Sequence, residues 1–300
     1  MGCQSARSMA QAGDRNSSRQ EPHKVETSEA KVLSLSSNST AGTGFFGDKA
    51  DEYARAYAEE TPGGFALRMR QKRVLELFDR AGGKVLDVGC GPAEMAQPLL
   101  SLGCEFWGVD PSPRMIEICR ARFGETKETH FAVGEACRLN FPDKFFDAVL
   151  CMGVIDGLKN LNEVLEEMLR VLKPNGTIII TFANKQSPYA WWKAQVFYRI
   201  LTLARKIAHP GANNDPILTR RRLFSPKEAS ELLANAGVRV ERVVGYFCTV
   251  FLSPLDEIWP AGALWLNQRL EETRNGKADW VAAGFILKAE KGKSENDSQK

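Results

Sequence analysis

The chain lacks the features that mark several common classes of protein. It has three histidines, at positions 23, 130 and 209, and seven cysteines without a Cys-x-x-Cys pair. No zinc-ligand spacing results, so no metal is expected. No apolar run reaches the roughly 18 residues of a membrane-spanning helix, and the N-terminus lacks the apolar core of a signal peptide. We therefore interpret the cysteines as reduced thiols of a cytoplasmic protein.

An excess of charge of one sign is also missing. The chain has 40 Lys and Arg residues against 37 Asp and Glu residues, a formal net charge of +3, which does not favour nucleic acid as a partner. Its 43% hydrophobic and 26% charged residues are ordinary for a globular chain. The polar ends, 1–43 and 291–300, are expected to be disordered and to flank one domain over 44–290. The sequence does not indicate an oligomeric state.

The strongest sign of function is the segment Lys84-Val85-Leu86-Asp87-Val88-Gly89-Cys90-Gly91. An apolar strand ends there in a glycine turn and then opens an expected helix, so the backbone can approach a ligand closely. Phe106-Trp107-Gly108-Val109-Asp110 is a second strand that ends in an acid, about twenty residues on, and an acid at that place accepts both hydroxyls of a ribose. Together the segments favour a nucleoside-type ligand over an ordinary strand–helix turn.

The residue at position 94 narrows the choice of nucleoside. Counted from Gly89, the dinucleotide fingerprint needs Gly or Ala there, and the chain has Glu94. An acid on the first turn of the expected helix would repel a pyrophosphate, whereas a ligand without phosphates is compatible with it. The motif therefore points away from NAD. Pro98 lies inside the same expected helix and should kink it.

Five motifs in this order resemble those of the class I S-adenosylmethionine-dependent methyltransferases, and in particular the ubiquinone/menaquinone-methyltransferase-like group. The glycine segment is similar to motif I, and Gly108-Val109-Asp110-Pro111-Ser112 with Met115 is similar to motif II. Gly134-Glu135-Ala136, followed by Phe141-Pro142-Asp143, resembles motif III. Phe145-Phe146-Asp147-Ala148-Val149 and Leu172-Lys173-Pro174-Asn175-Gly176-Thr177 resemble motifs IV and V. The resemblance covers positions 84–182.

This resemblance implies a fold and a cofactor. The fold is α/β and Rossmann-like: a seven-stranded, mostly parallel sheet with helices on both faces and an antiparallel last strand inserted beside the sixth. The cofactor is S-adenosyl-L-methionine. Two positions depart from the pattern, because Ala93 stands where many relatives have a third glycine and Glu135 replaces the usual Asp near the adenine. The implied cofactor-binding residues are Asp87, Gly89, Cys90, Gly91, Asp110, Pro111, Met115, Glu135, Ala136 and Cys151.

The segment 45–57 resembles the helical lead-in that covers the cofactor in many small-molecule methyltransferases. By that resemblance Tyr53 or Tyr57 lies near the methionine end, where an aromatic face is favourable beside a sulfonium. The alternative is a surface helix packed by its two tyrosines. Further helices are expected over 65–80, 112–123, 160–172 and 226–236, and further strands over 177–182, 238–250 and 279–289.

Two insertions are expected to select the methyl acceptor. The first, 183–224, is aromatic and basic, with no acid from Met168 through Asn214. It is either a cap that leans on a membrane and admits a lipid-like acceptor, or a cap helix buried against the domain. The second, 251–277, is strongly apolar and forms either the other wall of an apolar pocket or a cover for the sheet edge. A polar stripe on the first is expected at Gln195, Arg199, Thr202 and Lys206.

Methyl transfer needs little from the protein beyond alignment of the acceptor and exclusion of water. An oxygen acceptor would also need a general base, for which Asp156, just after the fourth strand, is the candidate; an ordinary turn acid is the alternative. The sequence thus predicts methyl transfer to a small or lipid-like acceptor at oxygen, nitrogen or carbon. A non-catalytic cofactor-binding module, suggested by Ala93 and Glu135, and a nucleic-acid methyltransferase, suggested by Arg220 to Arg222, are the alternatives.

Overall fold

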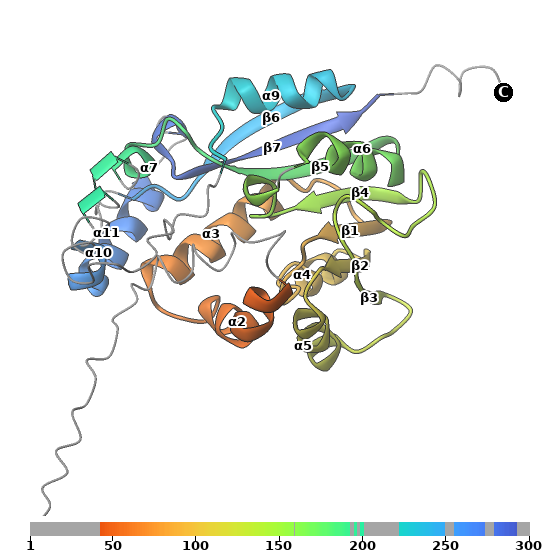
Figure 1. Cartoon of the computed structure of the whole chain (residues 1–300), viewed down its shortest axis with the longest axis horizontal. Coiled ribbons are helices and arrows are strands. Elements are labelled where there is room, and N and C mark those ends of the chain that lie inside the picture. Colours follow the sequence, from red (N-terminus) through yellow and green to blue (C-terminus); the bar gives the residue numbers. More distant parts are fainter. Residues whose placement is uncertain are drawn as a thin grey trace, which may run out of the picture.

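The computed structural model of the chain describes residues 43–158, 160–192, 195–196, 199–200, 222–249, 255–273 and 279–292. It contains one seven-stranded sheet in the order β3-β2-β1-β4-β5-β7-β6 (Figure 1). Strands β1 to β5 pair in parallel, and β7 is inserted between β5 and β6, antiparallel to both. The predicted Rossmann-like sheet with its antiparallel last strand is confirmed.

The last three strands differ from the expected bounds. Strand β5 begins at Leu172, five residues before the expected start at 177. Strand β6 ends at Tyr246 instead of continuing to 250, and β7 begins only at Gly284, because Asp279–Val281 forms a 3-10 turn, η3. The strands are β1 (Lys84–Val88), β2 (Glu105–Asp110), β3 (Thr129–Val133), β4 (Phe146–Cys151), β5 (Leu172–Ala183), β6 (Val238–Tyr246) and β7 (Gly284–Lys291).

The helices begin where the sequence offers caps. Ser112 accepts a hydrogen bond from the backbone N–H of Met115, and Ser225 forms a capping box with Glu228, each followed by a proline in the first turn. Thr61 caps the helix expected from 65, which therefore starts earlier. The helices are α2 (Thr43–Ala56), α3 (Pro62–Leu77), α4 (Ala96–Ser101), α5 (Pro113–Phe123), α6 (Leu161–Val171), α7 (Pro188–Trp192), α9 (Pro226–Asn235), α10 (Leu255–Ile258) and α11 (Pro260–Thr273).

The described helices cover both faces of the sheet. Side chains of α6 and α9 pack on one face in a core that includes Phe182 and Phe285. Side chains of α3, α4 and α5 pack on the other, around Phe106 and Ile179 (Figure 1). Burial on both faces explains the apolar, β-branched sequence of the central strands. It also leaves the strand ends as the place where polar groups can gather.

The helix after motif I begins later than expected. Residues 91–95 form turns, and α4 starts only at Ala96. Pro98 therefore lies in the first helical turn, where no intrahelical N–H is needed, so the expected kink is wrong. Glu94 precedes the helix instead of occupying its first turn.

Parts of the predicted insertions are described. Helix α7 represents the first insertion, and α10 and α11 represent the second. Of the predicted polar stripe, Gln195 and Arg199 are described and exposed, whereas Thr202 and Lys206, with Arg220 and Arg221, lie outside the described residues. The same holds for 1–42 and 293–300 of the ends expected to be disordered. Within the part of the chain that is described, no helix is both long and apolar enough to cross a membrane.

Candidate functional site

The carboxyl ends of β1, β2 and β4 meet at one edge of the sheet. Asp87 of β1 lies opposite Gly108 of β2 and Leu150 of β4 in the strand register. Asp110 ends β2 and Cys151 ends β4, so these predicted site residues are brought to the same edge. In open α/β sheets ligands bind outside the carboxyl ends of the strands. This edge is therefore the candidate functional site.

The loop after β1 has a backbone that most side chains would prevent. Gly89 has φ +72° and Gly91 has φ +52°, both in the left-handed region that favours glycine. A Cβ atom on Gly89 would overlap Cγ2 of Val154. Ala93, at the position of the expected third glycine, also has a positive φ, of 57°. The departure from the motif thus keeps the backbone conformation that a glycine would give, at some cost in strain.

Asp110 joins this loop to the next helix. Its Oδ2 accepts a hydrogen bond from the N–H of Gly91 over 3.0 Å, and its Oδ1 accepts one from the N–H of Ser112 over 2.9 Å. Burial raises the pKa of the Asp110 carboxyl to about 6, opposed by these two N–H donors. Pro111 follows directly, and Met115 is buried in the first turn of α5.

Asp87 is fully buried, and within the described residues neither of its carboxylate oxygens has a hydrogen-bond partner. Burial raises its pKa to about 7; nearby Arg70 opposes this rise and Asp110 adds to it. An unsatisfied buried carboxyl costs free energy, and such a cost at a strand-end edge indicates a ligand that donates to it. Motif I therefore supplies a hydrogen-bond acceptor, the Asp87 carboxyl, as well as a glycine loop.

Arg70 of α3 was not predicted as a site residue. Its Nη2 donates to the hydroxyl of Tyr57 over 3.0 Å and to that of Tyr53 over 3.3 Å, and a Cβ on Gly153 would overlap its guanidinium. Arg70 is 7% exposed. The sequence did contain one signal, a charged residue among apolar ones, because Arg70 lies on the buried face of α3 with Leu67, Val74 and Leu77.

Tyr57 directly follows α2 and is half-buried, with its ring edge-on to that of Tyr53 at a centroid distance of 5.7 Å. Burial raises the pKa of the Tyr57 hydroxyl far above its usual range, so it stays protonated. A Cβ on Gly91 would lie 3.4 Å from the ring of Tyr53. The predicted lead-in segment thus does cover the glycine loop.

The remaining predicted residues border the same edge. Cys90 is buried, and its N–H donates to the carbonyl of Val109 over 3.1 Å. Burial raises the pKa of the Cys151 thiol well above its usual range. The N–H of Gly134 donates to the carbonyl of Asp110, which brings motif III beside β2. There Glu135 is exposed and Ala136 is half-buried.

Asp156 lies in the short turn η1 (Ile155–Gly157) after β4 and is 5% exposed. Its Oδ1 accepts a hydrogen bond from the N–H of Ala183 over 3.0 Å, and its carbonyl accepts one from the N–H of Arg222 over 2.8 Å. Asp156 therefore connects the loop after β4 to both ends of the first insertion. Its role as a base or substrate anchor stays a prediction.

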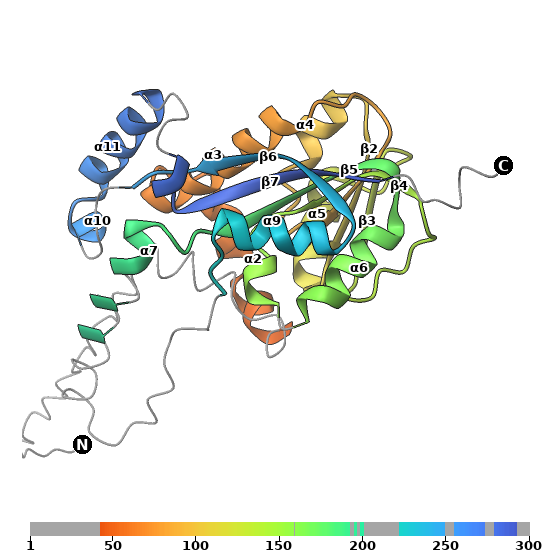
Figure 2. The same ribbon diagram turned by 90° about the horizontal axis from the view of Figure 1, so that it is seen from above.

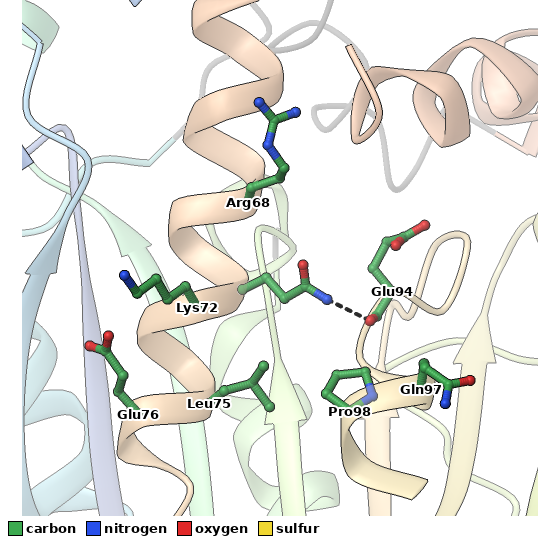
Figure 3. A pocket seen from close by; sticks show the side chains of 8 residues that line it. Arg68, Lys72, Leu75, Glu76, Glu94, Gln97 and Pro98 are labelled. Carbon is green, nitrogen blue, oxygen red and sulfur yellow. Dashed lines mark hydrogen bonds between the residues drawn. The ribbon is translucent and has the colours of Figure 1, made fainter. Parts of the chain in front are cut away.

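An open groove of about 700 Å³ lies between α3 and the segment that joins β1 to α4, together with the first turn of α4 (Figure 3). Gln71 crosses it and donates to the carbonyl of Glu94 over 2.6 Å. None of the predicted site residues lines it. The lining residues are Arg68, Gln71, Lys72, Leu75, Glu76, Glu94, Gln97 and Pro98.

Comparison with known proteins agrees with this geometry. Residues 86–180 match the family model described as a methyltransferase domain. A ubiquinone biosynthesis O-methyltransferase of Bradyrhizobium diazoefficiens is 30% identical over 43% of this chain and 49% of its own length. A demethylmenaquinone methyltransferase of Tropheryma whipplei is 35% identical over 33% of this chain and 41% of its own length. The chain thus spans about half the length of these curated relatives.

Solved structures share the fold. A methyltransferase of Thermotoga maritima, described as a possible histamine N-methyltransferase, has a TM-score of 0.54 and 24% identity, covering 82% of this chain and 97% of its own. The magnesium protoporphyrin IX methyltransferase of Synechocystis, solved with bound S-adenosylhomocysteine, has a TM-score of 0.54 and 15% identity, covering 85% and 100%. Residues 86–180 of this chain therefore match a methyltransferase domain, and the chain has the fold that S-adenosylmethionine-dependent methyltransferases share.

Proposed function

We propose that the chain transfers the methyl group of S-adenosylmethionine to a small or lipid-like acceptor. The observation that carries the proposal is the buried, unsatisfied Asp87 beside Asp110 at the strand-end edge. Two carboxyls at that edge suit a ligand with ribose hydroxyls at one end and a cationic group at the other. When bound, S-adenosylmethionine supplies the activated methyl group.

In this proposal motifs I and II hold the nucleoside. Asp110 accepts the ribose hydroxyls, and the glycine loop at Gly89 and Gly91 leaves room for the ligand beside the backbone. Pro111, Met115, Glu135, Ala136 and Cys90 border the adenosine. Cys151 contributes a neutral wall at the end of β4, because its thiol stays protonated.

Arg70 and Asp87 hold the methionine end. Asp87 pairs with the ammonium group, and Arg70 donates to the carboxylate with the guanidinium N–H groups that the tyrosines leave over. Tyr53 and Tyr57 fix Arg70 from the side of α2 and place aromatic rings beside the sulfonium. The buried carboxyl of Asp87 and the buried guanidinium of Arg70 are then matched by the ammonium and the carboxylate of the ligand.

For the acceptor we propose a compound of the quinone type. The support is that two relatives are named for ubiquinone biosynthesis and for demethylmenaquinone, and that both insertions carry large apolar residues. Asp156 serves as base or substrate anchor, depending on whether the methylated atom is oxygen, nitrogen or carbon.

The test uses methyl-labelled S-adenosylmethionine, whole-cell extract and the purified full chain, with the products divided into organic, aqueous and macromolecular fractions. We expect label in the organic fraction that is lost with Asp110→Ala. Label in the aqueous fraction would leave a methyltransferase and overturn the lipid-like acceptor. Label in the macromolecular fraction would favour a nucleic-acid or protein acceptor. Cofactor binding without label in any fraction would favour a non-catalytic module and contradict the proposal.

A further inference from the structure

Asn267 of α11 is a second buried polar side chain without a hydrogen-bond partner in the described part of the chain. None of its surface is exposed, and neither its carboxamide oxygen nor its carboxamide nitrogen is paired with a described residue. Burial of an amide without hydrogen bonds costs free energy, so native structures rarely leave one unsatisfied. Like Asp87, Asn267 has every polar atom of its side chain unsatisfied, which indicates a ligand that supplies the missing bonds.

Asn267 lies on the face of α11 that is turned to the domain. Ala263 and Asn267 are one helical turn apart and are both fully buried, and Glu271 follows one turn later on the same face. The Glu271 carboxylate pairs with Arg73 of α3 over 3.2 Å and accepts a hydrogen bond from the N–H of Cys248 over 3.1 Å. The Asn267 carboxamide is therefore enclosed between α11 and the domain.

This face of α11 lies beside the candidate site. Arg73, the partner of Glu271, is one helical turn from Arg70, which the proposed function assigns to the methionine end of the cofactor. In both perpendicular views α11 lies at the end of the sheet where β5 leads into α7 (Figure 1, Figure 2). Strands β1, β2 and β4 end at the same edge, because they run parallel to β5. The adenosine occupies the side of β1 and β2 in the proposed function, which leaves the side of β5 and α11 to the methyl acceptor.

The chemistry of a carboxamide specifies the kind of group that satisfies it. Asn267 offers N–H donors and a carbonyl acceptor side by side, so a hydroxyl group, which both donates and accepts, matches it. The residues that flank Asn267 on the helix are apolar: Ala263 is buried, and Leu266 and Leu270 are half-buried. Small-molecule sites commonly combine an apolar wall with a few convergent polar groups. A ligand without oxygen would fill this wall but leave the carboxamide unsatisfied.

We infer that Asn267 binds a hydroxyl group of the methyl acceptor and thereby selects acceptors that carry one. The carboxamide oxygen accepts a hydrogen bond from the hydroxyl, and the carboxamide nitrogen donates one to the hydroxyl oxygen. The inference rests on the proposed function for the identity of the ligand as a methyl acceptor. It deepens that function by naming a residue of α11 that determines specificity and the group on the acceptor that this residue recognises.

The test uses two probes of similar size, 1-naphthol and 1-methylnaphthalene, which differ by a hydroxyl group in place of a methyl group. Equilibrium dialysis measures the affinity of each for the full chain saturated with S-adenosylhomocysteine. The ratio of the affinity for 1-naphthol to that for 1-methylnaphthalene should fall about tenfold from the wild type to Asn267→Leu, because the variant cannot bond the hydroxyl. Gln268→Leu, at an exposed position of the same helix, is the matched control and should keep the wild-type ratio.

A second measurement needs no ligand. Replacement of an unsatisfied buried amide by an apolar side chain of similar size removes a desolvation cost, so Asn267→Leu should raise the midpoint of thermal unfolding of the ligand-free chain by ~2 °C or more. An unchanged or lower midpoint would show that Asn267 is satisfied within the fold and would overturn the inference.

The remaining outcomes separate this inference from the proposed function. An unchanged affinity ratio in Asn267→Leu, or failure of both naphthalenes to bind the chain loaded with S-adenosylhomocysteine, would overturn the role of Asn267 and leave the cofactor assignment intact. Affinity for S-adenosylhomocysteine itself should be equal in the wild type and Asn267→Leu. Its absence from the wild type would contradict the proposed function, while the unfolding midpoint still tests Asn267.

Discussion

The backbone N–H of Gly91 lies 3.0 Å from Oδ2 of Asp110, so the loop after β1 holds the acid at the end of β2. A second donor, the N–H of Ser112, fixes the other oxygen over 2.9 Å. The carboxylate is therefore oriented by the backbone before any ligand arrives. Orientation of this kind reduces the entropy that binding costs.

Replacement of Asp110 should remove most of the affinity for the cofactor. Hydrogen bonds to a charged acceptor contribute about 1.5–3 kcal/mol each, so Asp110→Ala should weaken S-adenosylhomocysteine binding by at least ~100-fold. Asp110→Asn keeps one carbonyl acceptor and should lose less. Isothermal titration calorimetry measures both, and equal affinities for Asp110→Ala and the wild type would contradict the assignment.

The stability of the ligand-free chain should depend on the ionisation of Asp87. Its pKa is about 7 in the folded chain against 3.8 without the fold, so between these values the folded state binds more protons than the unfolded state. The free energy of unfolding should therefore fall as pH rises from about 4 to about 7, by roughly 4 kcal/mol at most, and then level off. Asp110, at about 6, acts in the same direction. Urea unfolding across this range measures the effect.

Asp87→Asn is the control for this pH dependence. The variant should lose much of the fall between pH 4 and 7 and should be more stable than the wild type at pH 8, while binding S-adenosylmethionine more weakly. Binding of a cationic group beside Asp87 should also release protons near pH 7, which titrations in buffers of different ionisation enthalpy detect. An unchanged pH profile in Asp87→Asn would show that another group is responsible.

Gly89→Ala should destabilise the fold and the cofactor loop together. The new Cβ would overlap Val154 and would force alanine into a φ of +72°, and the two costs sum to roughly 2–5 kcal/mol. Thermal unfolding measures the loss. The double variant Gly89→Ala/Val154→Ala should regain the stability lost to the overlap but not the stability lost to backbone strain. A complete rescue of stability, or no rescue, would each disagree with this account.

Arg70→Met should lower the affinity for S-adenosylmethionine by about 10- to 150-fold, because one charge-assisted pair is lost from a buried site. Arg70→Lys should keep part of it, since lysine lacks the planar fork that bonds a carboxylate with two donors. An analogue of the cofactor without its carboxylate is the matched control. It should bind the wild type and Arg70→Met with similar affinity, and a large difference would place Arg70 elsewhere in the site.

Two variants of Asp156 distinguish a positioning role of this residue from a chemical role. If it only holds Ala183, Asp156→Asn keeps an acceptor for that N–H and should retain most methyl transfer, whereas Asp156→Ala loses it. If it acts as a base, both variants should be inactive and the wild-type rate should follow the ionisation of one carboxyl. The rate of methyl transfer against pH for the three proteins decides between these results.

The site residues that could be predicted are those in local sequence motifs at the ends of consecutive strands. Gly89, Gly91 and Asp110 each end or follow a strand, and parallel pairing of β1 with β2 brings them together without any knowledge of the helices. Arg70 was missed because its partners come from a separate segment and its signal was a charge in a buried stripe of α3. Arg70 becomes recognisable as a site residue only once α2 packs on the glycine loop, and no local sequence pattern predicts that packing.

The errors in the fold also have local causes. The late start of α4 follows from the left-handed conformations at Gly91 and Ala93, which no helix can include. The early end of β6 accompanies Phe247, whose φ of 55° turns the chain out of the sheet. Ala93 and Phe247 do not favour positive φ, so their conformation is imposed by the surrounding structure.

The most direct test of the central claim is calorimetric titration of S-adenosylhomocysteine into the purified full chain and into Asp110→Ala. This account predicts one binding site for the wild type and at least ~100-fold weaker binding for the variant. No binding to the wild type at millimolar ligand, or equal binding to both proteins, would contradict it.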